Sequence, residues 1–166
     1  MLVAATAADF DAVLRINRAA RPGVAVLEQA DLAAIFASEG ELLLWREAER
    51  CTGYVIVYED KADYDGEEFG WFRASLHEPF LYIDQIAIAP EARGRGLGRR
   101  IYGVAASRAR EQGKVGLACE VNLLPPNPGS LAFHARIGFA EVGRMGTRDG
   151  REVCLLACAL AAMRTV

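Results

Sequence analysis

Four arginines and three glycines are interleaved over positions 93–100, directly after an apolar run that ends at Pro90. A helical pattern starts at once, because Leu97, Ile101 and Val104 recur at helical spacing. A glycine-rich turn that leads into a helix leaves backbone N–H groups unpaired, and the helix dipole adds partial positive charge there. The stretch therefore suits a phosphate or pyrophosphate. A surface turn with solvated arginines explains the same residues.

Two common phosphate-binding patterns do not fit this turn. A P-loop needs Gly-x4-Gly-Lys-Ser/Thr, and no lysine follows the glycines directly. A dinucleotide fingerprint that starts at Gly94 needs its third glycine at the position of Arg99. The pattern that does fit is Arg-x-x-Gly-x-Gly, at Arg93, Gly96 and Gly98.

A second block lies downstream, beyond one predicted helix and one predicted strand. It spans positions 127–139 and reads Asn-x-x-Ser-x-x-Phe-His-x-Arg-x-Gly-Phe. The first pattern resembles the acyl-CoA pyrophosphate loop of the GCN5-related N-acetyltransferases, and the second resembles that family's block Asn-x-x-Ala-x-x-x-Tyr-x-Lys-x-Gly-Phe. The predicted order of helices and strands is also that of the family. The resemblance therefore covers essentially the whole chain.

The resemblance implies an acetyl-CoA site. Backbone amides of residues 95–99, with the arginine side chains, would hold the pyrophosphate. The pantetheine arm would pair with the backbone of residues 86–88 like an added β-strand, and an amide of that strand would polarise the thioester carbonyl. The cofactor-binding residues that the resemblance implies are Ile86, Ala87, Ile88, Arg93, Gly94, Arg95, Gly96, Leu97, Gly98, Arg99, Asn122, Asn127, Ser130, Phe133 and Arg136.

The same resemblance implies direct transfer of the acetyl group to a primary amine, which must lose a proton before it attacks. Asp84 and Glu120 are the candidate bases, because each carboxylate stands within an apolar predicted strand and burial would raise its pKa. The alternative is a strand-edge acid that faces solvent or pairs with an arginine. Where the family has the tyrosine that protonates the departing thiolate, this chain has His134. Imidazole can donate a proton near neutral pH, although a structural role explains the residue as well.

The acceptor is expected to be a small molecule, an amino acid or a peptide. Its pocket should form from Asn17, the connection 22–27 and the acidic and aromatic segment 60–79, because carboxylates and aromatic rings suit a cationic amine. Two other functions stay open. One is a non-catalytic acyl-CoA-binding sensor or regulatory module, which the missing tyrosine favours, and the other is a nucleotide-binding protein. A homodimer is compatible with the family.

Composition narrows the class of protein further. The chain has 166 residues, which predicts a single domain, 1–166. Its net charge of −3 argues against a nucleic-acid partner, and no apolar run is long enough for a membrane span. The N-terminus lacks the basic start of a signal peptide. Cys51, Cys119, Cys154 and Cys158 have no CxxC spacing, which predicts buried free thiols, no metal site and a cytoplasmic setting.

These candidate residues must be positioned by a sheet with helices on both faces, because strands and helices alternate along the chain. Together with the resemblance, this predicts an α/β (α+β) fold, with a mixed, mostly antiparallel sheet of six to seven strands and about four helices. Residues 60–79 show no periodicity and are expected to form a loop, either a functional lid or a flap. Periodicity predicts strands at 1–5, 41–47, 52–59, 82–89, 115–121, 139–145 and 152–160, and helices ending near 20 and at 28–38, 97–112 and 130–137.

Overall fold

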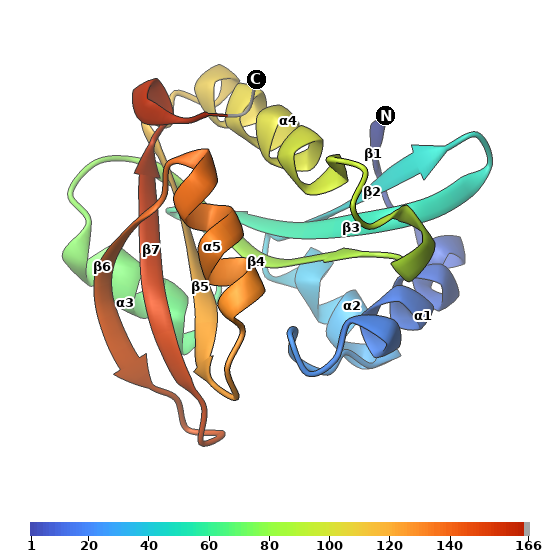
Figure 1. Cartoon of the computed structure of the whole chain (residues 1–166), viewed down its shortest axis with the longest axis horizontal. Helices are drawn as coiled ribbons and strands as arrows, with labels where there is room; N and C mark the ends of the chain where they lie inside the picture. The colour runs from blue at the N-terminus through green and yellow to red at the C-terminus, as the bar shows by residue number, and fades with distance from the viewer. Residues whose placement is uncertain (165–166) are drawn as a thin grey trace.

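One mixed sheet runs through the protein, and its neighbouring strands are antiparallel except for a single pair (Figure 1). The computed structural model describes residues 1–164. The sheet has seven strands in the order β1-β2-β3-β4-β5-β7-β6, and only β4 and β5 run parallel. The prediction of a mostly antiparallel mixed sheet is confirmed. The strands are β1 (Leu2–Ala4), β2 (Glu41–Glu47), β3 (Arg50–Glu59), β4 (Phe80–Ile88), β5 (Gly116–Leu124), β6 (Ala140–Gly146) and β7 (Glu152–Ala159).

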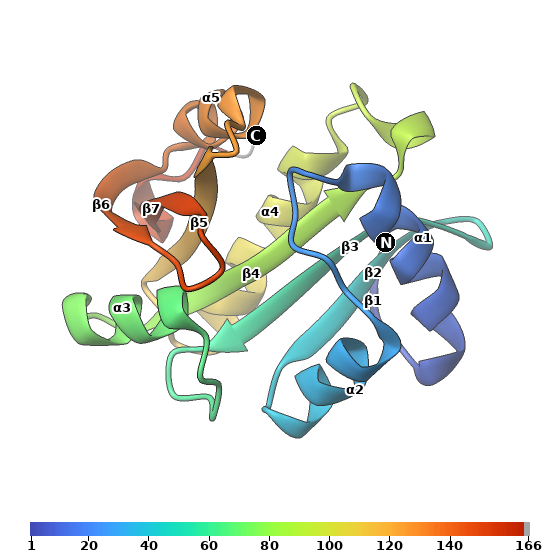
Figure 2. The same cartoon turned by 90° about the horizontal axis from the view of Figure 1, so that it is seen from below.

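Helices cover both faces of this sheet (Figure 2). Tyr54 and Ile56 of β3 pack in the core with α1–α3, while Val55 and Val57 pack in the core with α4 and α5. This alternation explains the continuous apolar runs in the sequence, because a strand that is covered on both faces has no polar side. The helices in residues 1–164 are α1 (Phe10–Ala20), α2 (Gln29–Ala37), α3 (Glu67–Ser75), α4 (Leu97–Glu111) and α5 (Pro128–Ile137).

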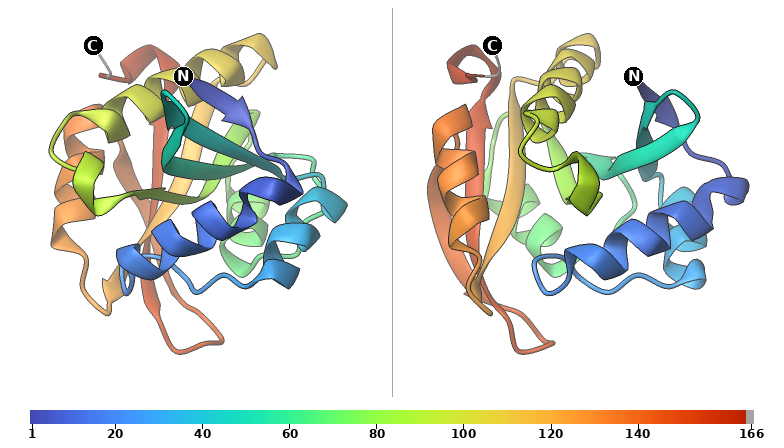
Figure 3. Two further views of the ribbon diagram at one scale, coloured as in Figure 1. Left: turned by 90° about the vertical axis from the view of Figure 1, so that its right-hand side faces the viewer. Right: turned by 45° about the vertical axis from the view of Figure 1, so that its right-hand side comes forward.

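The parallel strands β4 and β5 separate part-way along their length. Pairing joins Phe80–Ile83 to Gly116–Cys119 and then stops, although both strands continue for another five residues. β4 stays paired with β3, and β5 stays paired with β7. Figure 3 shows the two parts of the sheet turning away from each other. The gap between residues 84–88 of β4 and 120–124 of β5 is called the wedge below.

The segment 60–79, expected to be a loop without periodicity, contains helix α3. Its side chains Phe69 and Phe72 are fully buried and pack against the aromatic rings of β4. The helix is only nine residues long and has Gly70 near its middle. Local periodicity therefore gives little signal, and packing against the sheet stabilises the helix. The loop prediction is wrong for this part of the segment.

The four cysteines are buried and free, as predicted. Within residues 1–164, no helix combines the length and the hydropathy that a membrane crossing needs. Over the same range, the structure contains no group of three or more His, Cys, Asp and Glu side chains that could hold a metal ion.

Gly138, which ends α5, provides a test of the fold. Its φ is +107°, and a Cβ at this position would lie 2.8 Å from the backbone oxygen of Ala162. We expect Gly138→Ala to lower the free energy of unfolding by about 2 kcal/mol, because side chains disfavour this φ and the clashing atom belongs to the backbone. Urea unfolding followed by circular dichroism measures the change.

Gly129→Ala is the matched control on the same helix. Gly129 lies in the first turn of α5, and a Cβ there would meet no atom within 4 Å. This variant should raise the free energy of unfolding by about 0.5 kcal/mol through helix propensity. Equal unfolding midpoints for the two variants would contradict the assignment of Gly138.

Candidate active site

A cavity of about 570 Å³ lies at the wedge. Its walls come from the segment 23–27, from α2 and α3, from β4 and β5 on either side of the gap, and from α4 and α5. The structure thus brings together predicted site residues from three separate stretches of sequence. Those that border the cavity are Asp84, Ile86, Glu120, Asn122, Asn127, Ser130 and His134.

The two candidate bases, Asp84 and Glu120, lie on the face of the sheet that α1–α3 cover. Each bonds a tyrosine that belongs to that core or packs against it, Tyr64 for Asp84 and Tyr82 for Glu120. The Tyr82 hydroxyl donates to Glu120 at 2.7 Å, and the Tyr64 hydroxyl donates to Asp84 at 2.9 Å. These contacts do not fit the alternative of a strand-edge acid that faces only solvent.

Burial changes the protonation of both carboxyl groups. It raises the pKa of Asp84 to about 6; the hydrogen bond from Tyr64 opposes this shift, and the charge of Glu68 adds to it. Burial also raises the pKa of Glu120 well above its usual range, and the charges of Asp84 and Glu68 contribute further. The pair can therefore accept a proton near neutral pH, as a base acting on an amine must.

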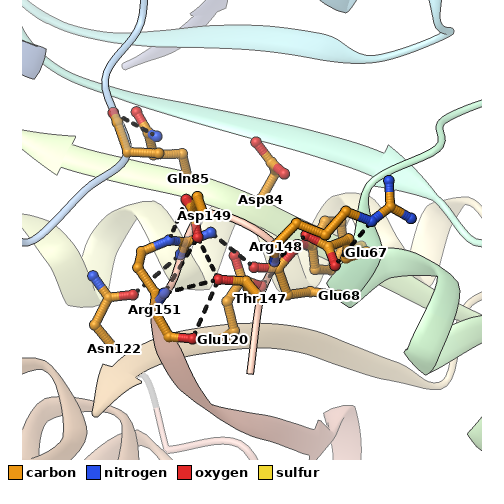
Figure 4. Close-up of polar contacts among 12 residues, drawn as sticks. Glu67, Glu68, Asp84, Gln85, Glu120, Asn122, Thr147, Arg148, Asp149 and Arg151 are labelled. Carbon is orange, nitrogen blue, oxygen red and sulfur yellow. Dashed lines mark hydrogen bonds and ion pairs between the residues drawn. The ribbon is translucent and has the colours of Figure 1, made fainter. Parts of the chain in front are cut away.

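Arg151, directly before β7, adds one cation to this wall (Figure 4). Its guanidinium bonds Glu68 at 3.1 Å, Asp149 at 2.8 Å and Asn122 Oδ1 at 3.2 Å. These bonds tie α3 to the β6–β7 hairpin. Glu68 belongs to the acidic segment 60–79 that was expected to form the acceptor pocket, and it does border the cavity. Sequence reasoning missed Arg151, because it belongs to no motif and is 83 positions away from Glu68.

His134 borders the cavity from α5, on the opposite face of the sheet. Its Nδ1 is 2.7 Å from the backbone oxygen of Ser130, and its Nε2 is 2.7 Å from the hydroxyl of Tyr102 on α4. Burial lowers the pKa of His134, so its ring is neutral at neutral pH. Tyr102 was also missed, because its spacing on α4 is that of an ordinary core residue and the contact joins two helices.

The arginine–glycine turn leaves a row of backbone amides without backbone partners. In the described chain, no amide of residues 94–99 bonds another backbone group, whereas the amide of Arg100 bonds the oxygen of Gly96. Gly98 allows close contact with α5, because a Cβ there would lie 3.2 Å from the ring of Phe133. The unpaired amides and the positive end of the α4 dipole thus lie beside α5, where they can bind an anion.

The arginine side chains of the turn have two different roles. Arg93 donates to one backbone oxygen of β4 and one of α1, at 3.0 Å each, and Arg95 pairs with Glu47 at 3.0 Å. These two side chains hold the turn in place. Arg99 and Arg100 are exposed and form no ion pair in the part of the chain that the structure describes. Of the predicted arginines in this turn, Arg99 is therefore the one whose guanidinium stays available to a phosphate.

Residues 86–88, predicted to pair with the pantetheine arm, border the wedge on the β4 side. Ala87 is buried in the core with α1–α3, and Ile86 and Ile88 are half-buried against the core with α4. Leu97 is buried as well, so Ala87 and Leu97 can meet a cofactor only through backbone atoms. Because β5 does not pair with residues 84–88, backbone groups on that side of β4 can bind an extended ligand.

The second block forms the start and body of α5. Asn127 caps the helix by accepting the amide of Ser130 at 3.2 Å, and its Nδ2 lies 3.5 Å from the oxygen of Gly23. Phe133 is half-buried against α4, whereas Arg136 is exposed and does not border the cavity. The block therefore provides one helix cap, one ring and one surface cation beside the turn.

A family model described as the Acetyltransferase (GNAT) family matches residues 11–139. This chain belongs to the GNAT acetyltransferase family. The matched range includes the arginine–glycine turn, the wedge and the second block, so the predicted family is confirmed.

The GNAT chain is similar to L-amino acid N-acyltransferase MnaT of Escherichia coli (strain K12), at 29% identity over 114 residues. That match covers 66% of this chain and spans 65% of the length of the relative. Among solved structures, it resembles the ribosomal-protein-S18-alanine N-acetyltransferase from Escherichia coli, with a TM-score of 0.71 and 16% identity over 96% of this chain and 93% of that chain. It also resembles YncA from Salmonella typhimurium, solved with its cofactor acetyl-CoA, with a TM-score of 0.68 and 19% identity over 96% and 93% of the two chains. The structural likeness confirms the predicted fold.

Asn17 of this GNAT chain does not line the acceptor side of the cavity, contrary to our expectation. It is fully buried and holds the segment 23–27, which does border the cavity. Its Nδ2 donates to the oxygen of Ala25 at 2.8 Å, and its Oδ1 accepts the amide of Leu27 at 3.2 Å. Nδ2 also lies 2.9 Å from Oε1 of Gln85 on β4. Asn17 therefore acts behind the cavity wall by fixing its backbone.

Replacing Asn17 should test this supporting role. We expect Asn17→Ala to lower the free energy of unfolding by about 3 kcal/mol, because backbone groups of the segment 23–27 and Gln85 lose their buried partner. Arg18→Ala, at the next and exposed position of α1, is the control and should change it by less than about 0.5 kcal/mol. Denaturant unfolding measures both. Equal losses for the two variants would show that Asn17 does not hold the segment.

The raised pKa of Asp84 makes a separate prediction about stability. As pH rises from about 4, the usual pKa of aspartate, through about 6, the folded state holds a proton that the unfolded state has lost, so stability falls. We expect Asp84→Asn to raise the free energy of unfolding at neutral pH by on the order of 1 kcal/mol, with little effect near pH 4. Thermal unfolding at the two pH values measures the difference. Lower stability of the variant at neutral pH would contradict the prediction.

Proposed function

We propose that this GNAT protein transfers an acetyl group from acetyl-CoA to a primary amine of a small molecule, an amino acid or a peptide, by direct attack of the amine on the thioester. One observation carries the proposal. A single cavity contains an unpaired strand edge, which suits the pantetheine arm, and two carboxylates with raised pKa, which suit the amine. The acetyl-CoA bound by YncA supports the choice of donor.

The cofactor would contact three elements. Its pyrophosphate would bind the free amides of residues 94–99 and the exposed guanidinium of Arg99. Its pantetheine arm would run along the backbone of residues 86–88, with Asn127, Ser130, Phe133, Arg136 and Asn122 on the other side. This binding mode would put the thioester at the closed end of the wedge, where a β4 amide would donate to the carbonyl oxygen and stabilise the oxyanion.

Asp84 and Glu120 would act together as the base. An amine that arrives as an ammonium ion must lose a proton before its nitrogen can attack the carbonyl carbon. Two carboxyl groups with raised pKa values in one cavity take up such a proton more readily than a solvated carboxylate does. The tetrahedral intermediate then releases CoA as a thiolate, and the acylated amine leaves on the α1–α3 side.

The acceptor side favours a cationic amine. Six carboxyl groups line the cavity, against the one guanidinium of Arg151; they belong to Asp31, Asp63, Asp65, Glu68, Asp84 and Glu120. The stacked rings of Tyr58 and Tyr64, whose centroids are 4.0 Å apart, complete that wall. L-amino acids form the first class to test, because the Escherichia coli relative is named for them. The four buried free thiols support a reducing, cytoplasmic setting.

An acyl-CoA sensor without turnover is the second candidate. The residue at the position of the family's tyrosine, His134, is neutral and has both ring nitrogens within hydrogen-bond distance of protein groups. A chain that bound CoA without a donor for the thiolate would hold the cofactor and release it unchanged.

Incubation with acetyl-CoA and a panel of amines tests the proposal. The panel contains L-amino acids, polyamines and peptides with free N-termini, and mass spectrometry identifies the products. We expect an N-acetylated product, and a kcat/KM that falls as pH drops below about 6, because Asp84 becomes protonated. Asp84→Asn should lower kcat/KM by about 10²-fold.

Asp11→Asn, at an exposed position on α1, is the matched control and should keep the wild-type kcat/KM. Tight binding of CoA in thermal-shift assays, with no transfer to any amine, would replace the proposal with the sensor. Binding of ATP that CoA cannot displace would favour a nucleotide-binding protein.

A further inference from the structure

Two buried rings, Tyr102 on α4 and His134 on α5, form a hydrogen-bonded pair at the closed end of the wedge. Their exposed fractions are 1% and 4%, and both rings border the cavity. Cys119 is the last residue of β5 that pairs with β4, and it borders the cavity as well. The pair therefore lies at the level where the two strands begin to separate.

The hydrogen bonds decide which atom of the pair carries a proton. A carbonyl oxygen can only accept, so Nδ1 of His134, which is 2.7 Å from the oxygen of Ser130, must carry the ring proton. The Ser130 hydroxyl lies 3.2 Å from the same nitrogen. Since the ring is neutral, Nε2 has no proton and accepts from the Tyr102 hydroxyl at 2.7 Å. Within the pair, the Tyr102 hydroxyl therefore carries the one proton that is not bonded to a carbonyl oxygen, and this proton must leave Nε2 to meet a ligand in the cavity.

Aromatic packing holds the phenol in place. Tyr102 meets His134 edge to face at an interplanar angle of 90°, and Phe139 packs on it at 75°. Phe133 adds a third ring, with its centroid 5.8 Å from that of Tyr102. A ring enclosed on several sides has few alternative rotamers, so its hydroxyl is directed without the cofactor being present.

The carboxylates and the phenol lie on opposite faces of the sheet. Asp84 and Glu120 bond tyrosines that belong to the core with α1–α3 or pack against it, while Tyr102 packs in the core with α4 and α5. A thioester in the gap would meet the amine on one face and the phenol on the other. This arrangement separates a proton donor from the carboxylates that must remain free to accept a proton.

A thiolate at this position needs a proton. Burial raises the pKa of the Cys119 thiol well above its usual range, and the charge of Glu120 adds to the shift. A CoA thiolate in the same surroundings would meet the same desolvation. Burial also raises the pKa of Tyr102, and Cys119 and Glu120 are the titratable groups that raise it further. Desolvation thus raises the pKa of the phenol and would raise that of the CoA thiol in the same direction. It therefore does not prevent proton transfer from the phenol to the thiolate.

We propose that Tyr102 is a catalytic residue that donates a proton to the departing CoA thiolate, and that His134 is a positioning residue that acts through it. The inference rests on the proposed acetyl transfer. It replaces the expectation that His134 itself is the donor. Nε2 of that ring carries no proton, because it accepts a hydrogen bond from Tyr102.

The step balances in atoms and charge. The C–S bond of the tetrahedral intermediate breaks, and its electron pair goes to sulfur. The hydroxyl proton of Tyr102 leaves its hydrogen bond with Nε2 and moves to the sulfur, which gives the CoA thiol and a phenolate. The phenolate takes a proton from water as the thiol departs. Once the C–N bond has formed, the nitrogen loses a second proton to water, which offsets the proton that the phenolate takes. The carboxylate pair releases to water the proton that it took from the ammonium ion, so the reaction yields the amide, the thiol and one proton.

Kinetics of Tyr102→Phe test the donor. We expect kcat to fall by about 10²-fold, while the KM for acetyl-CoA and the Kd for CoA stay within about twofold of wild type, because the lost proton is needed only when the thiolate leaves. Thermal unfolding of the same preparation confirms that the variant is folded. A general structural defect would instead weaken CoA binding together with kcat.

Variants of His134 separate positioning from catalysis. His134→Ala should lower kcat, and His134→Gln should restore part of it, because the amide oxygen can accept the Tyr102 hydrogen bond in place of Nε2. The double variant Tyr102→Phe/His134→Ala should be no slower than Tyr102→Phe alone, since the two residues act as one unit. Additive losses would contradict the pair.

The ultraviolet absorbance of the thiolate of bound CoA provides a readout that does not depend on turnover. The bound thiol should have a lower pKa in wild type than in Tyr102→Phe, because the phenol donates a hydrogen bond to the thiolate. If wild type is active and Tyr102→Phe keeps kcat within threefold and the same thiol pKa, the inference is overturned and the proposed function stands. If wild type binds CoA but acetylates no amine, the proposed function fails and the inference fails with it.

Discussion

The candidate site depends on one interruption of backbone hydrogen bonding, where β4 and β5 stop pairing after Ile83 and Cys119. Backbone groups inside a sheet are normally paired, so an interruption in the middle of one leaves donors and acceptors for a ligand. The sheet remains continuous up to this point because β4 is still paired with β3 on its other edge, and β5 is still paired with β7. Recognition by main chain would need no special side chains, and residues 86–88 are ordinary apolar strand residues.

The same interruption places ionisable groups where water is scarce. Desolvation raises the pKa values of Asp84 and Glu120 and lowers that of His134. Each shift disfavours the charged form and therefore opposes stability in the pH range where that group is ionised in the unfolded chain. It also brings the carboxyl groups toward the range in which they can exchange protons near neutral pH. The same pKa shifts therefore lower the stability of the folded state and suit these groups to proton exchange, a conflict that is common at functional sites.

A set of side-chain contacts positions the groups that border the cavity and the turn beside it. Asn17 fixes the segment 23–27, and Arg151 ties α3 to the hairpin. Arg93 and Arg95 hold the turn, whose amides at 94–99 have no backbone partner in the described chain. In each case a polar or charged side chain bonds a distant element, so the site is assembled from segments that are far apart in the sequence. None of these contacts requires a ligand to be in place.

The sequence alone determined the family, most of the sheet and the places of the turn and the second block. These features are local: glycine spacing, a strand before a helix and alternating apolar runs depend on neighbouring residues. Tertiary structure alone decided that α3 is a helix, that Asn17 lies behind the wall and that Tyr102 meets His134. Those outcomes depend on burial and on contacts between distant segments, which no local pattern records, because a buried tyrosine in the core and a tyrosine that presents a proton to a cavity have the same spacing on a helix.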